Sequence, residues 1–245
     1  MEFGFGSGIL TGLRTDVANA TPERFGALQD VSVEFNGDIK ELFATQQFPI
    51  DVARGKTKIQ GKAKVAEIKG SMYNNLFFGQ TLATGQLKYA YNESTTLGTG
   101  AASYTVANSA STPLTDQGVF YGTTGNQLTF VSSAPGSAQY TWNPATGVYG
   151  FSTFDAGVGV LVNYTYHVAT GNNIAIGNPF MGTTPIFTAT FFQQFEGNQV
   201  VLVLNKCVSS RLSFPTRIDD YVIQELDFSS FADGAGNVGT WNTTN

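Results

Sequence analysis

The chain of 245 residues is long enough for one large β domain or two smaller ones, and its net charge of −5 argues against a dedicated nucleic-acid-binding protein. Charged residues make up only 13% of the chain, which is low and indicates that part of the surface is covered in an assembly. A single cysteine excludes an intrachain disulfide framework. Because the apolar runs are short, we expect no membrane insertion.

The N-terminal segment, residues 1–30, mixes glycine, proline and single charges, so we expect an irregular arm without a secretion signal. Residues 31–43 then alternate between apolar and polar side chains. Since successive side chains of a strand point to opposite faces, this pattern predicts a two-faced strand. Its polar face carries Glu34, Asp38 and Lys40, and its apolar face carries Val33, Phe35, Ile39 and Phe43.

A second strand is predicted over residues 49–68, beginning at Pro49, whose missing amide proton suits a strand start or edge. Every even position from 54 to 64 is basic or glutamine. The resulting basic face comprises Arg54, Lys56, Lys58, Lys62 and Lys64. Like charges in a row repel each other, so this face must lie in water, beside acidic groups or along an anionic partner. The two strands together predict a long two-faced hairpin.

The segment from Ser71 to Gly79 is the best helix candidate in the chain. Its apolar residues recur at the spacing of one helical face, which predicts a packing surface. These residues are Met72, Tyr73, Leu76 and Phe77. We expect Ser71 to cap the N-terminal end of the helix and Gly79 to close its C-terminal end.

The composition changes between Tyr89 and His167, where there is no lysine or arginine and the only acids are Glu93, Asp116 and Asp155. Turn signals separate short β segments here, as is typical of a small β sandwich or barrel. The predicted strands are 103–106, 118–121, 128–131, 139–142, 148–151 and 158–166. We interpret 97–168 as a module inserted into a core domain formed by 1–96 and 169–245. The alternative is a decorated set of loops on one sheet.

Mixed composition returns after residue 170, with strands predicted at 185–192, 199–204 and 221–228 and a loose tail at 239–245. The chain as a whole is therefore predicted to be all-β, an antiparallel sandwich or barrel with one long hairpin and one short helix. No repeat of a solenoid is present.

Few residues suggest catalysis or metal binding. His167 is the only histidine, and neither a Gly-x-Ser-x-Gly elbow nor any spacing argument supports a pairing with Cys207. Cys207 lies in an apolar run and is expected to be buried. The acids at 219–220 and the loop 233–237 could ligate a cation through oxygen, but turns are the preferred interpretation. We therefore expect no catalytic residue, no metal site and no cofactor.

The basic face leaves two interpretations open. It is solvated or paired within the chain, with Glu34, Asp38 and Glu67 as the available acids. Otherwise it makes a charge-complementary contact with the next copy of the chain, or lies in a channel that carries DNA.

With these features in view, most of the chain resembles the tail tube (major tail) proteins of long-tailed bacteriophages. The resemblance rests on residues 31–78, with the two alternating strands and the short helix, and on the C-terminal part from Met181 to Val238. The middle of the chain, including Gly147-Val-Tyr-Gly-Phe151, is similar to a small β segment common in phage proteins of this kind.

This resemblance implies a structural virion protein, made in the host cytoplasm, whose subunits form rings that stack into a hollow tail tube. The rings are usually hexamers, and long hairpins join sheets across subunits into an inner barrel. The implied partners are further copies of the chain, the tape-measure, tail terminator and baseplate or distal tail proteins, and transient double-stranded DNA in the lumen. A strongly basic lining would hinder sliding DNA, so most of Arg54–Lys64 should face acidic groups of neighbouring subunits.

The main alternative is a phage decoration or receptor-binding protein whose middle module recognises host surface glycans. That hypothesis predicts a small oligomer, whereas the tube predicts rings or polymers. A polysaccharide depolymerase would need a pair of carboxylates in a cleft, and acids are few in this chain.

Overall fold

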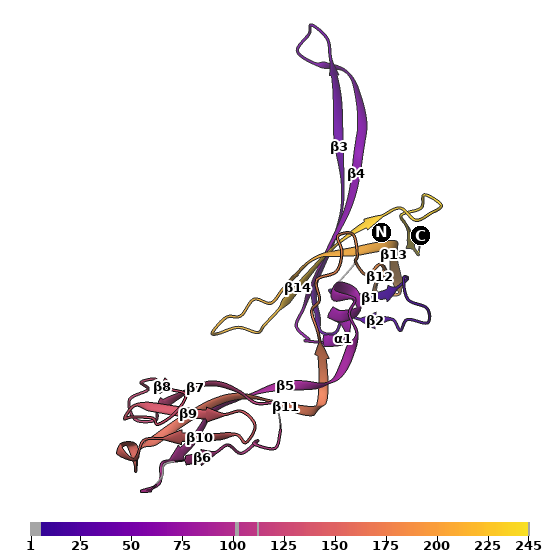
Figure 1. Ribbon diagram of the computed structural model, residues 1–245. Coiled ribbons are helices and arrows are strands. Elements are labelled where there is room, and N and C mark those ends of the chain that lie inside the picture. Colours follow the sequence, from indigo (N-terminus) through magenta and orange to yellow (C-terminus); the bar gives the residue numbers. More distant parts are fainter. Residues whose placement is uncertain (1–5, 101–102, 112, 245) are drawn as a thin grey trace. The chain divides into compact units, whose positions relative to one another are not determined.

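A computed structural model describes residues 6–100, 103–111 and 113–244, which divide into two compact units. The first unit combines the chain up to Leu82 with the chain from Ile174 onward, and the second is Ala83–Asn173. Both are built from β-strands, with one short α-helix in the first (Figure 1), so the predicted all-β class is confirmed. The second unit is wider than the module expected at 97–168, because long strands on both sides belong to it.

The first unit contains an eight-stranded sheet made from both ends of the chain. Its strands are β1 (Ile9–Arg14), β2 (Glu23–Arg24), β3 (Leu28–Phe43), β4 (Pro49–Val65), β12 (Phe187–Phe195), β13 (Asn198–Ser213), β14 (Gln224–Phe231) and β15 (Gly239–Thr243). The strand order is β2-β1-β12-β13-β14-β4-β3, with β15 also paired to β13. The described pairs are antiparallel, and the two predicted hairpin strands are β3 and β4.

A short helix, α1 (Gly70–Tyr73), continues into a π-helical turn, η1 (Asn74–Phe78), and packs on this sheet. Met72, Tyr73 and Leu76 are buried and Phe77 is partly buried, so all four residues predicted for the packing surface contact the core. The core side of this contact includes Leu10, Ala63, Val65, Phe187, Leu226 and Phe228. Each large apolar side chain buried here contributes about 1.5–3 kcal/mol, which holds the helix on the sheet.

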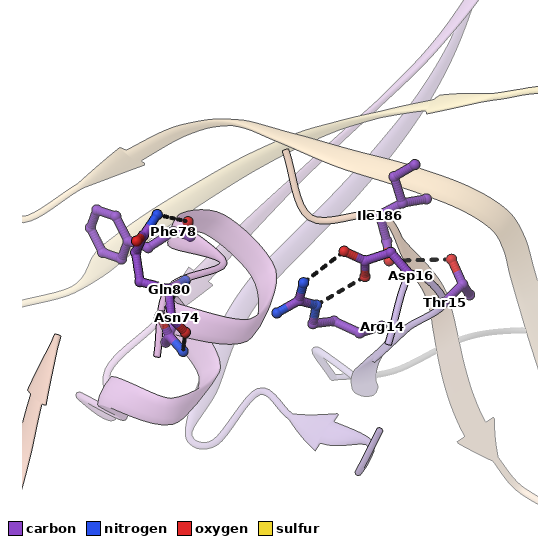
Figure 2. A network of polar contacts seen from close by, with 7 residues as sticks. All are labelled: Arg14, Thr15, Asp16, Asn74, Phe78, Gln80 and Ile186. Atoms are coloured by element: carbon purple, nitrogen blue, oxygen red, sulfur yellow. Dashed lines mark hydrogen bonds and ion pairs between the residues drawn. The ribbon is translucent and has the colours of Figure 1, made fainter. Parts of the chain in front are cut away.

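The two ends of the helical segment are closed by different means. Gly79 has a φ of +65° and donates its N–H to the Asn74 carbonyl at 2.6 Å, which confirms the predicted C-terminal closure. The Asn74 side chain also bridges the backbone of Gln80, donating to its carbonyl and accepting its N–H (Figure 2). The predicted Ser71 cap is wrong, because no side chain in the described part of the chain caps the helix and the Ser71 hydroxyl donates to Glu23 instead.

The second unit contains two sheets. Its strands are β5 (Leu82–Thr96), β6 (Ser103–Thr105), β7 (Thr115–Tyr121), β8 (Thr129–Phe130), β9 (Gln139–Asn143), β10 (Val148–Phe151) and β11 (Gly159–Ile174), and a 3-10 turn, η2 (Thr153–Asp155), precedes β11. One sheet has the order β5-β11-β7 and the other β6-β10-β9-β8, with β8 and β9 parallel. All six strands predicted between 103 and 166 are present, and they enclose a second apolar core.

The predictions for the two ends of the chain are wrong. Residues 1–5 lie outside the described residues, but the rest of the predicted arm contains β1 and β2, and β1 pairs with β12. The predicted loose tail contains β15, which pairs with β13. At the end of β1, the Arg14 guanidinium donates two hydrogen bonds to Asp16 and lowers the pKa of that carboxyl (Figure 2).

Candidate assembly interface

The β3–β4 hairpin extends far beyond its other partners in the sheet. β14 pairs with β4 only from Ile59 to Val65, so among the described residues the distal parts of β3 and β4 pair only with each other. From Glu34 to Lys58 every residue is exposed except Pro49, which is half-buried. Figure 1 shows this part as a long two-stranded ribbon. Since an isolated two-stranded ribbon is marginally stable in water, the feature points to a partner outside the chain.

A β-bulge changes the faces of the hairpin partway along. The pairing Gly37↔Thr57 is followed by Ile39↔Arg54, so β4 has one residue more than β3 at this point. A Cβ at Gly37 would lie 3.4 Å from Arg54 Cδ, which places Arg54 on the face of Gly37 and Ile39. The prediction that Arg54 belongs to the basic face is therefore wrong. The other predicted interface charges share the opposite face, namely Glu34, Asp38, Lys40, Lys56, Lys58, Lys62 and Lys64.

At the base of the hairpin, the basic face is neutralised within the chain. Lys64 Nζ lies 3.3 Å from Asp30 Oδ2, and Lys62 Nζ lies 3.1 Å from Glu225 Oε2. The hydrogen bond from Lys62 lowers the pKa of Glu225. The acids that pair with the lysines of the basic face are therefore Asp30 and Glu225, whereas Glu34, Asp38 and Glu67 were expected.

The distal cations differ from these two lysines. Lys40, Arg54, Lys56 and Lys58 form no ion pair with any residue in the described ranges. Only these distal side chains remain available for the predicted pairing with acidic groups of neighbouring subunits.

Apolar side chains accompany the unpaired charges. The exposed large apolar residues of the hairpin are Phe35, Ile39, Leu42, Phe43, Phe48, Ile50 and Val52. Phe48 in the connecting turn is 80% exposed, whereas Phe35 contacts Trp241 of β15 with ring centroids 6.4 Å apart. Exposed apolar side chains gathered on one element are typical of surfaces that contact another molecule.

The other residues considered for catalysis or metal binding lie in surroundings that fit a structural role. Cys207 is fully buried, and burial raises the pKa of its thiol to about 11, so the thiol is protonated and unreactive at neutral pH. Asp233 accepts hydrogen bonds from the N–H groups of Asn237 and Ala235, which lower its pKa and define a turn. His167 lies in β11. Among the described residues, no group of three His, Cys, Asp or Glu side chains could hold a metal ion.

The acids of the second unit accept hydrogen bonds from tyrosine hydroxyls, a pattern that was not predicted from the sequence. Asp116 accepts hydrogen bonds from the hydroxyls of Tyr140 and Tyr149 at 2.6 and 2.7 Å. Glu93 accepts from Tyr104 and Tyr164, both at 2.6 Å, and Asp155 accepts from Tyr121 at 3.1 Å. Asp116 and Glu93 each receive a bond from a strand of the other sheet, so they tie the two sheets together. The signal in the sequence was the presence of only three acids among many tyrosines.

No protein-family model matches the chain, and no curated protein matches it. None of the helices in the described ranges has the length and apolar character needed to cross a membrane.

Proposed function

We propose that this protein is a structural subunit that self-assembles into stacked rings and so forms the hollow tail tube of a long-tailed bacteriophage. The distal β3–β4 hairpin carries the proposal, because it exposes unpaired cations and apolar side chains on a ribbon with no other sheet partner among the described residues. The sequence resemblance to tail tube proteins supplies the expected assembly, a ring that is usually hexameric.

In this proposal the hairpins of adjacent copies continue each other's sheets. β3 stands at the end of the strand order, so one of its edges has no strand beside it in the described sheet. Pairing with the next copy satisfies the backbone groups of this edge and prevents unspecific pairing. Because the contact joins two different surfaces, it repeats head to tail, and a rotation between copies that completes a full turn closes the ring.

The proposed partners follow from the same assembly. Further copies of the chain build the tube in the host cytoplasm, and the finished tube belongs to the virion. Tape-measure, tail terminator and baseplate or distal tail proteins would contact the tube, and double-stranded DNA would pass through its lumen during genome ejection.

The experiment is negative-stain electron microscopy of the purified protein over a concentration series, combined with size-exclusion chromatography and light scattering. We expect rings or hollow tubes of uniform diameter. The double variant Phe48→Ser/Ile50→Ser should remain monomeric, because it removes exposed apolar side chains from the hairpin. Phe154→Ser is the matched control, since Phe154 is 85% exposed in the second unit and should not affect assembly. A wild-type protein that is monomeric at every concentration would contradict the proposal.

A further inference from the structure

The outer face of the sheet β5-β11-β7 carries a shallow cleft without charged side chains. Tyr89 and Tyr91 of β5, Phe120 of β7 and Leu161 of β11 form its apolar surface. The amides of Asn92, Gln117 and Asn163, together with Gly125, also line it. The face is directed away from the core of the second unit, because Ala90, Val119, Val160 and Val162, the alternate residues of the same strands, pack inward.

Two tyrosine rings dominate this surface. Tyr89 and Tyr91 stand two residues apart on the exposed side of β5, with ring centroids 6.4 Å apart and an interplanar angle of 39°. They are 53% and 77% exposed, respectively. Rings in this arrangement present a broad apolar platform with hydroxyl groups at its rim.

A buried amide fixes the backbone around the platform. Asn163, on the central strand β11, is 2% exposed. Its Oδ1 accepts the N–H of Asn92 at 2.8 Å, and its Nδ2 donates to the Gly118 carbonyl at 3.4 Å. Both partners have left-handed backbone conformations, with φ of +52° at Asn92 and +100° at Gly118, and the β7–β11 register shifts beside Asn163. Asn163 therefore holds an irregularity in each neighbouring strand, and such irregularities redirect side chains at binding sites.

The polar groups of the cleft are available to a ligand. The side-chain amides of Asn92 and Gln117 form no hydrogen bond with any described residue, although each offers donors and an acceptor. Aromatic platforms flanked by a few amides bind ligands that present both apolar C–H surfaces and hydroxyl groups. Sugar rings have this combination.

We propose that this face binds an uncharged saccharide, with Tyr89 and Tyr91 stacking on sugar rings and Asn92 and Gln117 bonding to hydroxyls. An uncharged ligand is supported because no charged side chain among the described residues lines the cleft. A single-stranded nucleic acid would need a basic groove beside the aromatic residues, and no lysine or arginine occurs from 89 to 167. The proposal does not depend on tube assembly and adds a second activity to the subunit.

The test uses the full chain on an immobilised panel of neutral oligosaccharides built from glucose, galactose, mannose and N-acetylglucosamine, with sulfated and uronic-acid glycans as the charged set. We expect retention on at least one neutral glycan. Calorimetry with that glycan should show a loss of affinity of about tenfold or more for Tyr91→Ala, and a change within about threefold for Tyr91→Phe, which keeps the ring.

Two further variants separate binding from folding. Asn92→Gly removes the amide while tolerating the left-handed backbone, so it should weaken binding without lowering the melting temperature. Phe154→Ala, an exposed aromatic outside the cleft, should bind as the wild type does. Retention on charged glycans alone, no retention on any neutral glycan, or equal affinity of the wild type and Tyr91→Ala would each overturn the proposal.

Discussion

The ring of Phe228 on β14 covers Gly61, the residue directly opposite it on β4, so a Cβ at position 61 would overlap the ring atoms. Phe228 is buried and also meets the ring of Phe187 edge-on, with centroids 5.9 Å apart. Because Gly61 has no side chain, the Phe228 ring packs directly on the base of the hairpin and connects it to the core.

The variant Gly61→Ala should destabilise the first unit by about 1–3 kcal/mol, because the ring cannot stay in place beside the added methyl group. The measurement is the urea concentration at which the single cysteine, Cys207, becomes accessible to a thiol reagent, since this residue is buried in the same core. Gly37→Ala is the control, because its Cβ would meet Arg54 Cδ at an ordinary 3.4 Å. Equal urea midpoints for the two variants would contradict the prediction.

The variant Asp116→Asn should destabilise the second unit by about 1–3 kcal/mol. Asparagine offers one oxygen acceptor in place of two, so either Tyr140 or Tyr149 loses the acceptor of its hydroxyl. Trp142, whose ring lies 4.3 Å from that of Tyr149, reports on this site by fluorescence in a Trp241→Phe background. Glu196→Gln, a change at an acid in the first unit, should leave this transition unchanged.

Alkaline pH should unfold the second unit. Burial, followed by hydrogen bonds to Asp116, raises the pKa of Tyr140 and Tyr149. The folded state thus keeps phenol protons that the unfolded chain releases above the ordinary tyrosine pKa of about 10. The associated stability is complete below that pH and is lost as the pH rises above it.

The check is the free energy of unfolding measured at several pH values on both sides of about pH 10, with the ultraviolet absorbance of phenolate followed in parallel. The phenolate absorbance of the buried tyrosines should rise over the same pH range in which the second unit unfolds. A stability that does not change across this range would contradict the assignment of these tyrosines.

The distal and proximal lysines of the hairpin should affect assembly differently. Lys56→Ser/Lys58→Ser removes cations that have no partner among the described residues, so it should weaken assembly and reduce its dependence on salt. Lys62→Ser/Lys64→Ser removes partly exposed ion pairs within the chain, each worth about 1 kcal/mol, and should change assembly little. Light scattering at increasing sodium chloride concentration compares the two variants. If Lys62→Ser/Lys64→Ser weakened assembly more than Lys56→Ser/Lys58→Ser, the proposed contact of the distal lysines would be refuted.

Alternating side chains were sufficient to predict the hairpin and most short strands, because a two-residue period is a local property. The bulge at Arg54 was not predictable, since it depends on which residues of β3 and β4 face each other. β1 and β15 were missed for a related reason. β15 consists mostly of glycine and polar residues, and β1 is short and interrupted by Gly12. Both form strands by pairing with β12 and β13, which are separate segments of the chain.

The functional surfaces were predicted to different degrees. The charged hairpin was visible in the sequence as a row of lysines, but its acidic partners were not, because Glu225 comes to Lys62 through the pairing of β14 with β4. The hydrogen bonds from the Asn163 side chain to Asn92 and Gly118 could not be predicted, since they join residues of three strands.

The bulge also determines how many sides of the hairpin a neighbour must cover. Beyond it, Ile39 and Val52 lie on one face and Leu42 on the other, and all three are more than half exposed. A molecule lying flat against either face would leave apolar surface in water on the reverse side. Both faces of the distal ribbon therefore carry apolar surface, in addition to the free edge of β3 along which the proposed sheet continues.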